Sequence, residues 1–467
     1  MLVCTTSTVD FGTDLGHEGH GGQLMKGKKW IAMLVLLTVT ASMVLGCGSS
    51  AGAGTEDSGE EVAEESTPES EPESNGEKMT LNIWMNSDGL EQKEAIIEEY
   101  NAAHDDVEVV AAYYDTDGLK EQLKVAASSK TLPDAWKTYG GSFGQYFVDN
   151  GLAADITDYA EEHGWSDYFL EGPMQLCYYN DKLYGYPHSY NVVAMWYRKD
   201  IFEQAGIEVP QSFEEFLDAC SKLKAAGITP VSTSALYGWH VMRLIELFIE
   251  HYAGAELHDK LNSLEADWNC PEVIEAFTTY QEFCQNGYFP EGFLTANPDD
   301  TRMAVYTGDC AMDVDGQWFD SYLLDDEMDF DNYGYFVLPT SGTNRVSAFV
   351  EMFQFSKDIT PERMDACVDF MNYMYSNESM AKYGNGFNLP LPIVGADEPI
   401  GQPHVMDLFE ESSANGTFTI LDQAFPAEVA DVLFNAEAAI ANGEMTPEET
   451  AAQIQEAIEA YKANNAE

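Results

Sequence analysis

Apolar and polar positions recur with two different periods along residues 79–139. Leu81, Ile83 and Met85 are apolar at every second position, which predicts a strand, and DGLEQKEAIIEEYNAAH then has helical spacing with acidic residues in its first turn. VEVVAAYY reads as a second strand, LKEQLKVAASS as a second helix, and PDAWKTYGGS as a third strand that enters a glycine-rich turn. This alternation predicts an α/β fold with a parallel sheet covered by helices.

Polar and aromatic side chains follow these predicted strands. In parallel sheets, ligands bind beyond the carboxyl ends of the strands. The loops expected at that edge contain Trp84, Asn86, Asp88, Trp136, Tyr139 and Ser142. Each aromatic residue among them fits core packing about as well as ligand contact.

A different pattern occupies residues 25–46. The basic segment MKGKKW precedes the apolar run IAMLVLLTVTASMVLG, which ends in small residues, as in a secretory signal peptide. A membrane-spanning helix needs about 20 apolar residues, and this run is shorter. Residues 44–47, VLGC, resemble the lipobox of bacterial lipoproteins, which implies that Cys47 carries a lipid, including palmitate. The alternative is a short buried helix with an incidental cysteine.

Two further segments flank this signal. Residues 1–24 precede a methionine that starts a complete signal by itself, so we expect translation to begin at Met25 and residues 1–24 to be an upstream extension. Residues 47–78 begin with the expected lipidation site, and residues 48–78 are rich in Glu, Ser, Pro and Gly, with no aromatic residue. Such a segment cannot bury enough apolar surface to fold, which predicts a disordered acidic linker.

Composition adds two constraints. The chain has 467 residues, of which 45% are apolar, so it exceeds the size at which one core usually divides into two. Its formal net charge of −59 repels phosphate backbones and anionic lipid surfaces. We therefore expect two globular units and no nucleic-acid partner.

The cysteines and acidic motifs do not indicate a metal site. The cysteines after Cys47 show no CxxC spacing and no paired histidines, and Cys220 and Cys367 lie on apolar helix faces, as core residues do. DVDGQ at 313–317 resembles a calcium loop, but Ala311 and Tyr322 occupy its first and last ligand positions. We expect no metal, no cofactor and no particular disulfide.

A longer series of motifs carries a family resemblance. YGYP at 184–187, WYRKD at 196–200, IFEQAGI at 201–207 and SFEEF at 212–216 occur in the order found in family 1 extracellular solute-binding proteins. MAVYTGDCAMDVDGQWFDS, YGYFVLPT, VSAFVEMFQFSKD, ACVDFMNYMYS and NGEMTPEETAAQIQEAIEAY resemble later elements of that family. One departure is the usual glycine pair, which Phe349 and Val350 replace.

The resemblance implies a two-lobed periplasmic-binding-protein-like type II fold with a ligand cleft between the lobes. One lobe would combine residues 79–188 with 352–400, and the other 189–351 with 401–467. Crossing segments near 187–191 and 349–352 would form the hinge. The family consists of sugar-binding receptors of ATP-binding-cassette (ABC) importers, so the chain would be a lipid-anchored receptor outside the cell membrane. We expect a monomer that delivers a carbohydrate to permease subunits.

A sugar pocket needs flat aromatic faces and planar polar groups. By family position the firmest candidates are Trp239, Asp315 and Trp318, although both tryptophans also suit a core and Asp315 suits a helix cap. The full set expected to bind the ligand is Trp84, Asn86, Asp88, Tyr190, Asn191, Trp239, His240, Arg243, Asp315, Gln317, Trp318 and Glu351.

Two other functional classes remain open at this point. A secreted glycosidase needs only two suitably spaced carboxylates, and the chain has 81 acidic residues. However, no GxSxG, HExxH or phosphate-binding glycine loop is present, so we expect no enzyme. The same receptor fold also suits a peptide or a metal ion, because function depends on the site and not on the fold.

Overall fold

The structure is a computed structural model that describes residues 78–384 and 390–465. The expected signal peptide, Cys47, the upstream extension and almost all of the expected linker lie outside these residues. A single mixed sheet runs through the described part, with strands in the order β2-β1-β3-β10-β6-β8-β7; β11 pairs with β10, and β9 with β6. No helix of the described part is long and apolar enough to cross a lipid bilayer.

The first half of the sheet confirms the predicted strand and helix alternation. The strands β1 (Met79–Asn86), β2 (Val107–Tyr114) and β3 (Ala135–Tyr139) are parallel, and α1 (Leu90–Ala103) and α2 (Thr116–Ser129) connect them. The apolar side chains of β1 that alternate in sequence are completely or almost completely buried. They pack on the face covered by α1 and α13 (Pro361–Met374), whereas Trp84 faces the α2 side.

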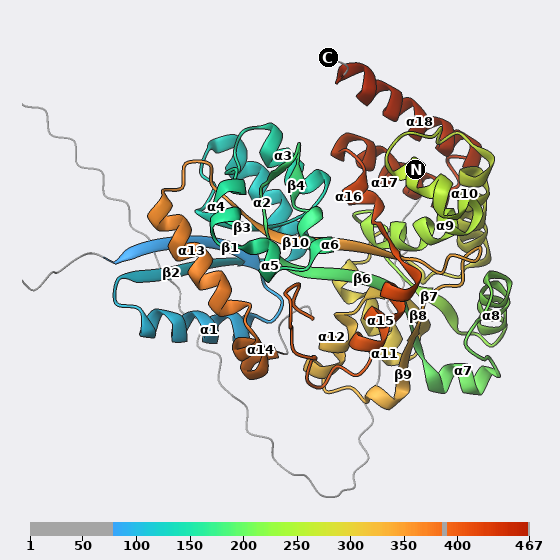
Figure 1. Ribbon diagram of the computed structural model, residues 1–467. Coiled ribbons are helices and arrows are strands. Elements are labelled where there is room, and N and C mark those ends of the chain that lie inside the picture. Colours follow the sequence, from blue (N-terminus) through green and yellow to red (C-terminus); the bar gives the residue numbers. More distant parts are fainter. Residues whose placement is uncertain (1–77, 385–389, 466–467) are drawn as a thin grey trace, which may run out of the picture. The chain divides into compact units, whose positions relative to one another are not determined.

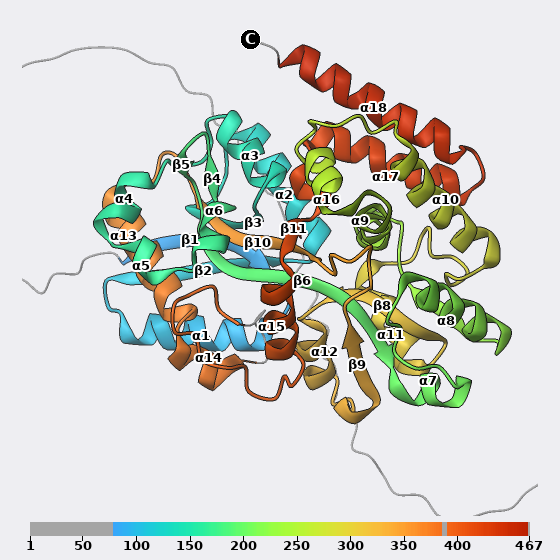
Figure 2. The ribbon, with the colours of Figure 1, turned by 45° about the vertical axis from the view of Figure 1, so that its right-hand side comes forward.

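Two long strands differ from the prediction of a parallel sheet. β6 (Tyr186–Arg198) and β10 (Val346–Phe355) pair with each other in antiparallel orientation, and β10 is also antiparallel to β3. Figures 1 and 2 show both strands running across the middle of the folded unit, from the half that holds β1 to the half that holds β8. Sequence periodicity could not show this, because these strands are buried on both faces and lack alternation.

The second half of the sheet is also mixed. β8 (Cys310–Gly316) is antiparallel to β6 and parallel to β7 (Thr229–Ser232), and β9 (Tyr333–Phe336) adds to β6. β11 (Thr417–Thr419) lies parallel to β10, while the small hairpin of β4 (Tyr178–Tyr179) and β5 (Lys182–Leu183) stands apart.

Helices cover both faces of the sheet. Those of the first half are α3 (Ser142–Asp149), α4 (Thr157–Glu162), α5 (Trp165–Tyr168), α6 (Glu171–Gln175) and α14 (Asn377–Tyr383). Those of the second half are α7 (Lys199–Ala205), α8 (Phe213–Ala225), α9 (Trp239–Asn262), α10 (Pro271–Asn286), η1 (Pro298–Asp300), α11 (Thr301–Thr307), α12 (Phe319–Asp325), η2 (Phe330–Asn332), α15 (Val405–Asn415), α16 (Leu421–Ala424), α17 (Ala427–Ala441) and α18 (Pro447–Asn464).

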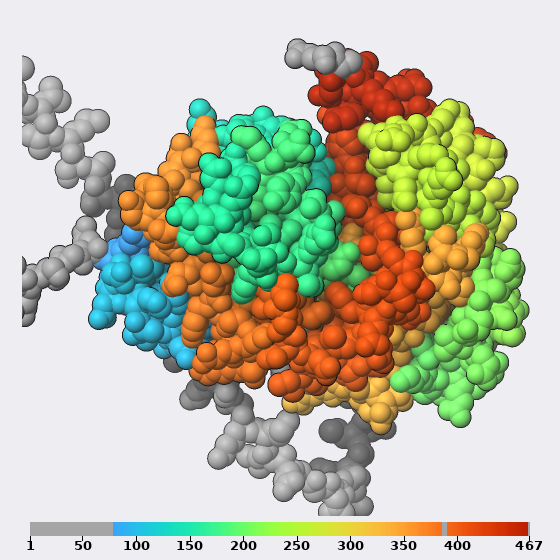
Figure 3. Space-filling model, viewed as in Figure 1, coloured from blue at the N-terminus to red at the C-terminus, as the bar shows by residue number. Residues whose placement is uncertain are grey.

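Two large hydrophobic cores result. We call the first the N-terminal core: it joins apolar residues of 81–186 with residues of 350–393. The second, the C-terminal core, joins residues of 193–349 with residues of 418–458. Each core thus combines early and late parts of the chain. Figure 3 shows one result, in which α13 and α14 lie against α1 despite their distance in sequence.

Local sequence signals place several of these helices. Ser212 caps α8 by accepting a hydrogen bond from the backbone N–H of Glu215 (3.1 Å). The Glu215 carboxylate accepts from the N–H of Gln211 (2.7 Å) and not from that of Ser212, so this helix start has only one of the two hydrogen bonds of a capping box. Cys220 and Cys367 are buried core residues as predicted, and the six cysteines of the described part are all free thiols.

Candidate functional site

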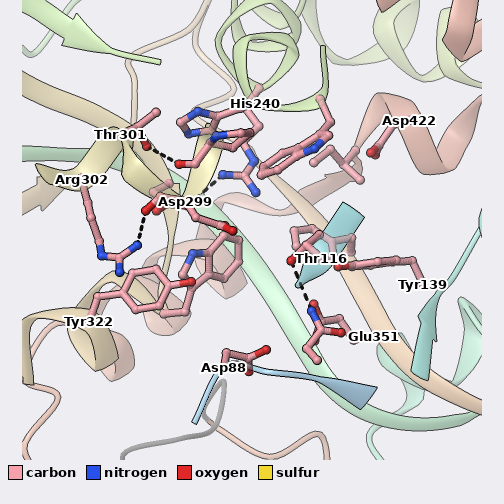
Figure 4. Close-up of a pocket in the computed structure, with 18 of the residues that line it drawn as sticks. Asp88, Thr116, Tyr139, His240, Asp299, Thr301, Arg302, Tyr322, Glu351 and Asp422 are labelled. Atoms are coloured by element: carbon pink, nitrogen blue, oxygen red, sulfur yellow. Dashed lines mark hydrogen bonds and ion pairs between the residues drawn. The ribbon is translucent and has the colours of Figure 1, made fainter. Parts of the chain in front are cut away.

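A cavity opens between the two cores. The empty space inside it, together with the solvent at its open mouth, amounts to about 1070 Å³. Its lining comes from the carboxyl ends of β1, β3 and β8, the start of α9, the middle of β10, and parts of η1, α12 and α16. Figure 4 shows side chains from these separate segments turned toward one space. The cavity therefore lies where the carboxyl ends of sheet strands predict a ligand.

An arginine between two tryptophans forms one wall. The Arg243 guanidinium lies over the rings of Trp239 (4.7 Å) and Trp318 (5.1 Å), and it donates a hydrogen bond to Asp315 (2.8 Å). Such cation–π contacts and the charged hydrogen bond orient all four side chains. Burial raises the pKa of Asp315, and the neighbouring Arg243 opposes this rise. The wall thus offers aromatic surface beside a fixed carboxylate.

A glycine makes room for this wall. Any Cβ on Gly316 would come within 2.0 Å of the Trp318 ring. Because that distance is far below a van der Waals contact, position 316 has to stay without a side chain for the ring to lie where it does.

The opposite wall contains a buried ion pair. Lys137 lies 3.1 Å from the Glu351 carboxylate and 3.8 Å from the centre of the Tyr139 ring. His188 lies 3.9 Å from the other carboxylate oxygen of Glu351. Burial and the positive charge of Lys137 lower the pKa of His188 well below its usual value, so this imidazole is neutral at pH 7. Glu351 is therefore held in place chiefly by Lys137.

The carboxyl end of β1 supplies a third group. Lys93 of α1 binds the Asp88 carboxylate at 3.0 Å and the backbone oxygen of Asn86 at 3.0 Å. Burial opposes the ionisation of Asp88, but Lys93 and Lys137 outweigh it and lower its pKa. The Asn86 amide donates to the hydroxyl of Thr116 (3.3 Å), while its Oδ1 is buried without a partner.

Side chains of α2 and of the start of α9 contact each other beside the cavity. The indole N–H of Trp239 points to the carboxylate of Asp117 at 3.3 Å, and Lys120 lies 3.7 Å from the same carboxylate. Lys120 also lies over the rings of Trp239 (5.5 Å) and Phe143 (4.8 Å). These contacts link α2 to the start of α9, across the opening.

The structure brings together eight of the twelve residues expected from the sequence. Those that line the cavity are Asn86, Asp88, Trp239, His240, Arg243, Asp315, Trp318 and Glu351.

It places the other four outside the lining. Trp84 packs against Tyr114 on the α2 side of β1, and the hydroxyl of Tyr190 bonds to that of Thr417. Asn191 and Gln317 are fully buried and bond to each other at 2.8 Å. Their amides connect β6 to the end of β8, so they support the cavity wall without being part of its lining.

Other lining residues were not expected from the sequence, namely Thr116, Lys120, Phe143, Asp299, Thr301, Arg302, Ser321, Tyr322, Asp325, Ile420, Asp422 and Gln423. Most lie on helices or short turns whose place in space depends on tertiary packing. Tyr139 also lines the cavity, and its position at the carboxyl end of a predicted strand was the sequence signal that indicated a place near the ligand.

Within residues 78–384 and 390–465, no group of three or more His, Cys, Asp or Glu side chains converges on a point that suits a metal ion. The Asp313 carboxylate behind the cavity lies 3.5 Å from His240, and both are buried; burial lowers the pKa of that histidine and raises that of the aspartate.

Comparisons with known proteins agree with this architecture. Residues 95–397 match the profile of a family described as bacterial extracellular solute-binding protein. A solved structure titled chitin oligosaccharide binding protein superimposes with a TM-score of 0.75 at 23% identity, covering 83% of this chain and all of that one.

Two curated relatives match at lower coverage. An uncharacterised ABC transporter extracellular-binding protein of Pyrococcus horikoshii is 24% identical over 44% of this chain and 46% of its own length. An sn-glycerol-3-phosphate-binding periplasmic protein of Escherichia coli is 22% identical over 50% of this chain and 55% of its own. The chain thus spans about half of the length of these relatives.

Proposed function

Because the chain belongs to the bacterial extracellular solute-binding protein family, we propose that it captures a carbohydrate and delivers it to the permease of an ABC importer. The observation that carries the proposal is the wall of Trp239, Arg243 and Trp318 beside the Asp315 carboxylate. Sugar rings present apolar faces and a ring of hydroxyl groups. Flat aromatic surface next to oriented acceptors is complementary to both.

The polar lining favours a sugar over a phosphorylated solute. Six carboxylates and three cationic side chains line the cavity. Two of the cations, Arg243 and Lys120, already lie close to carboxylates, at 2.8 and 3.7 Å. A dianionic phosphate would add charge to a site that is already rich in negative charge. Hydroxyl donors instead suit free carboxylate and amide oxygens.

We propose that binding closes two lobes around the sugar. The lobes would comprise residues 79–188 with 352–400, and 189–351 with 401–467. The hinge would lie near 187–191 in β6 and 349–352 in β10. Both strands run between the two cores, and their register shifts between Glu351 and Met352, which supports a flexible point there. Hinge closure around a ligand is common in receptors of this kind.

The cellular setting is also part of the proposal. Residues 25–46 would export the chain, and a lipid on Cys47 would hold it at the outer face of the cell membrane as a monomer. Incorporation of labelled palmitate into the full chain, and its loss in Cys47→Ser, would establish the anchor. Incorporation that survives the substitution would refute it.

The proposal involves no bond-breaking chemistry. Ligand recovery tests this point: a bound oligosaccharide released by denaturation should have the same mass as the one added. Shorter products would indicate the glycosidase alternative. The peptide and metal alternatives are tested in the binding panel below.

The decisive experiment measures thermal unfolding of the purified protein against mono- and oligosaccharides, with peptides, iron and glycerol 3-phosphate as comparison ligands. A ligand at 100 times its dissociation constant adds about 2.7 kcal/mol to the free energy of unfolding. Trp318→Ala should abolish the response without loss of fold. Trp84→Ala is the matched control, because Trp84 lies outside the lining. A response to a comparison ligand alone would refute the proposed cargo.

A further inference from the structure

The cavity has more carboxylates than its own cations can neutralise. Half of its six carboxylates lie in close ion pairs, which are Asp88 with Lys93 (3.0 Å), Asp315 with Arg243 (2.8 Å) and Glu351 with Lys137 (3.1 Å).

The other three carboxylates are Asp299, Asp325 and Asp422, and none has an ion-pair partner within 4 Å in the part of the chain that the structure describes. They lie on η1, α12 and α16. Lys120 and Arg302, the remaining cations of the lining, are each shared with carboxylates beyond it, at 3.7 and 3.6 Å. The lining therefore has a local surplus of negative charge.

Asp422 is the most buried of the three surplus carboxylates. Its residue is 7% exposed, and its Oδ1 has no hydrogen-bond partner among residues 78–384 and 390–465. Figure 4 shows this side chain at the upper edge of the cavity, on the side away from Asp88. Asn86 Oδ1 is likewise buried and unpartnered in the lining. A buried acceptor without a partner is unfavourable, so a ligand donor that displaces its neighbours and reaches it would be favoured there.

Further acidic groups surround the surplus carboxylates. Glu246 and Glu437 are fully buried, and burial together with the charge of Asp422 raises the pKa of both carboxyl groups. At the mouth, burial and the nearby charge of Asp117 raise the pKa of Asp299. Burial is the main cause of each shift and disfavours charge of either sign, whereas the repulsion between neighbouring carboxylates favours a positive charge. At Asp422 itself, burial raises the pKa and the nearby Lys120 and Arg243 oppose this rise.

We propose that the bound carbohydrate is an amino sugar whose free ammonium group binds Asp422 inside the cavity. In an oligosaccharide, Asp299 and Asp325 would attract further ammonium groups at the mouth. An ammonium group has three donors and no acceptor, which matches unpartnered carboxylate and amide oxygens. A hydroxyl group at the same position lacks the charge, and N-acetylation removes both the charge and two donors. This inference rests on the proposed function, because it specifies the sugar class for the same cavity.

The test is calorimetric titration of the purified protein with sugars that differ at one substituent. Glucosamine, glucose and N-acetylglucosamine form one set, galactosamine and its counterparts a second, and the β-1,4-linked disaccharides of the first set a third. We expect the amino member of at least one set to bind tenfold tighter or more, which corresponds to about 1.4 kcal/mol. Neutral or N-acetylated members that bind as tightly would overturn this inference and leave the proposed function intact. Absence of binding by all members would overturn this inference, and the thermal-unfolding panel with the other sugars then decides the proposed function separately.

Two variants assign the preference to residues. Asp422→Asn keeps the shape and removes the charge, so the ratio of amino-sugar to neutral-sugar affinity should fall toward one. Asp299→Asn should lower the same ratio for the disaccharide, and it provides the test if the buried substitution impairs folding. Asp105→Asn is the control, since Asp105 lies on an exposed loop outside the lining. An unchanged ratio in both test variants would refute the assignment.

Discussion

The buried carboxyl group of Glu246 should make the protein less stable as the pH rises through neutrality. Glu246 lies on α9 and is fully buried. Its Oε2 accepts a hydrogen bond from the backbone N–H of Leu421 (3.0 Å), and the Ser347 hydroxyl also lies close enough to favour its ionised form. Burial and, to a smaller extent, the nearby Asp422 raise its pKa to about 8 from the usual 4.5.

The sign and the size of the effect follow from proton linkage. Below pH 4.5 Glu246 is protonated in both the folded and the unfolded chain, so the folded state has its full stability. Above pH 4.5 the unfolded chain releases the proton while the folded chain retains it until about pH 8. Each pH unit of this interval removes about 1.4 kcal/mol, so the loss by pH 8 is on the order of 4 kcal/mol.

Glu246→Gln should remove this dependence. The amide oxygen can still accept from Leu421, but the side chain no longer ionises. Unfolding entropy is about 2.1 cal/mol/K per residue, or roughly 0.8 kcal/mol/K for a folded unit of this size. By scanning calorimetry, the variant should therefore melt about 5 °C higher than the unchanged protein at pH 8 and only about 1 °C higher at pH 5.

Glu256→Gln serves as the control on the same helix. Glu256 is largely exposed and pairs with Lys260, so its replacement should not change the difference between the two pH values. If Glu246→Gln shifts the melting temperature equally at pH 5 and pH 8, then Glu246 is not a buried carboxyl with a raised pKa.

Three substitutions elsewhere test other parts of the structure. Gly316→Ala should displace the Trp318 ring, because the new Cβ would lie within 2.0 Å of it. Titration should then show at least tenfold weaker binding of the sugar, while circular dichroism should show an intact fold. Lys137→Met should leave the Glu351 carboxylate buried beside an apolar side chain and lower the free energy of unfolding by about 3–5 kcal/mol; a loss below about 1 kcal/mol in thermal unfolding would contradict this. Ser212→Ala should cost about 1 kcal/mol in the same assay, with unchanged sugar binding, because it removes the cap of α8.

Local periodicity predicted the first part of the fold well. The predicted strand and helix segments of residues 79–139 match β1, α1, β2, α2 and β3, because the apolar side chains of each element recur with the period of a strand or of a helix. The antiparallel pairing of β6 with β10 was not predictable in this way. That pairing joins residues more than 150 positions apart, and no local pattern encodes it.

Some candidate site residues could likewise be placed from local sequence patterns, and others only from tertiary packing. Asn86, Asp88 and Tyr139 follow strands, and their place at the carboxyl edge could be inferred from the strands alone. Asp422 could not, because α16 reaches the cavity only by packing against α9 and α3. Gln317 shows the opposite error: it is adjacent to lining residues in sequence, but its amide is used to join β6 and β8.

The sequence by itself determined which segments are strands and helices, which of their faces are apolar, and the family to which residues 95–397 belong. It also determined the surplus of acidic over basic residues. Only the tertiary structure decided which acidic residues are paired and which face the cavity without a partner. The physical reason is distance: an ion pair or a buried acceptor depends on a few ångströms between side chains, and those distances are set by how the two cores pack around β6 and β10.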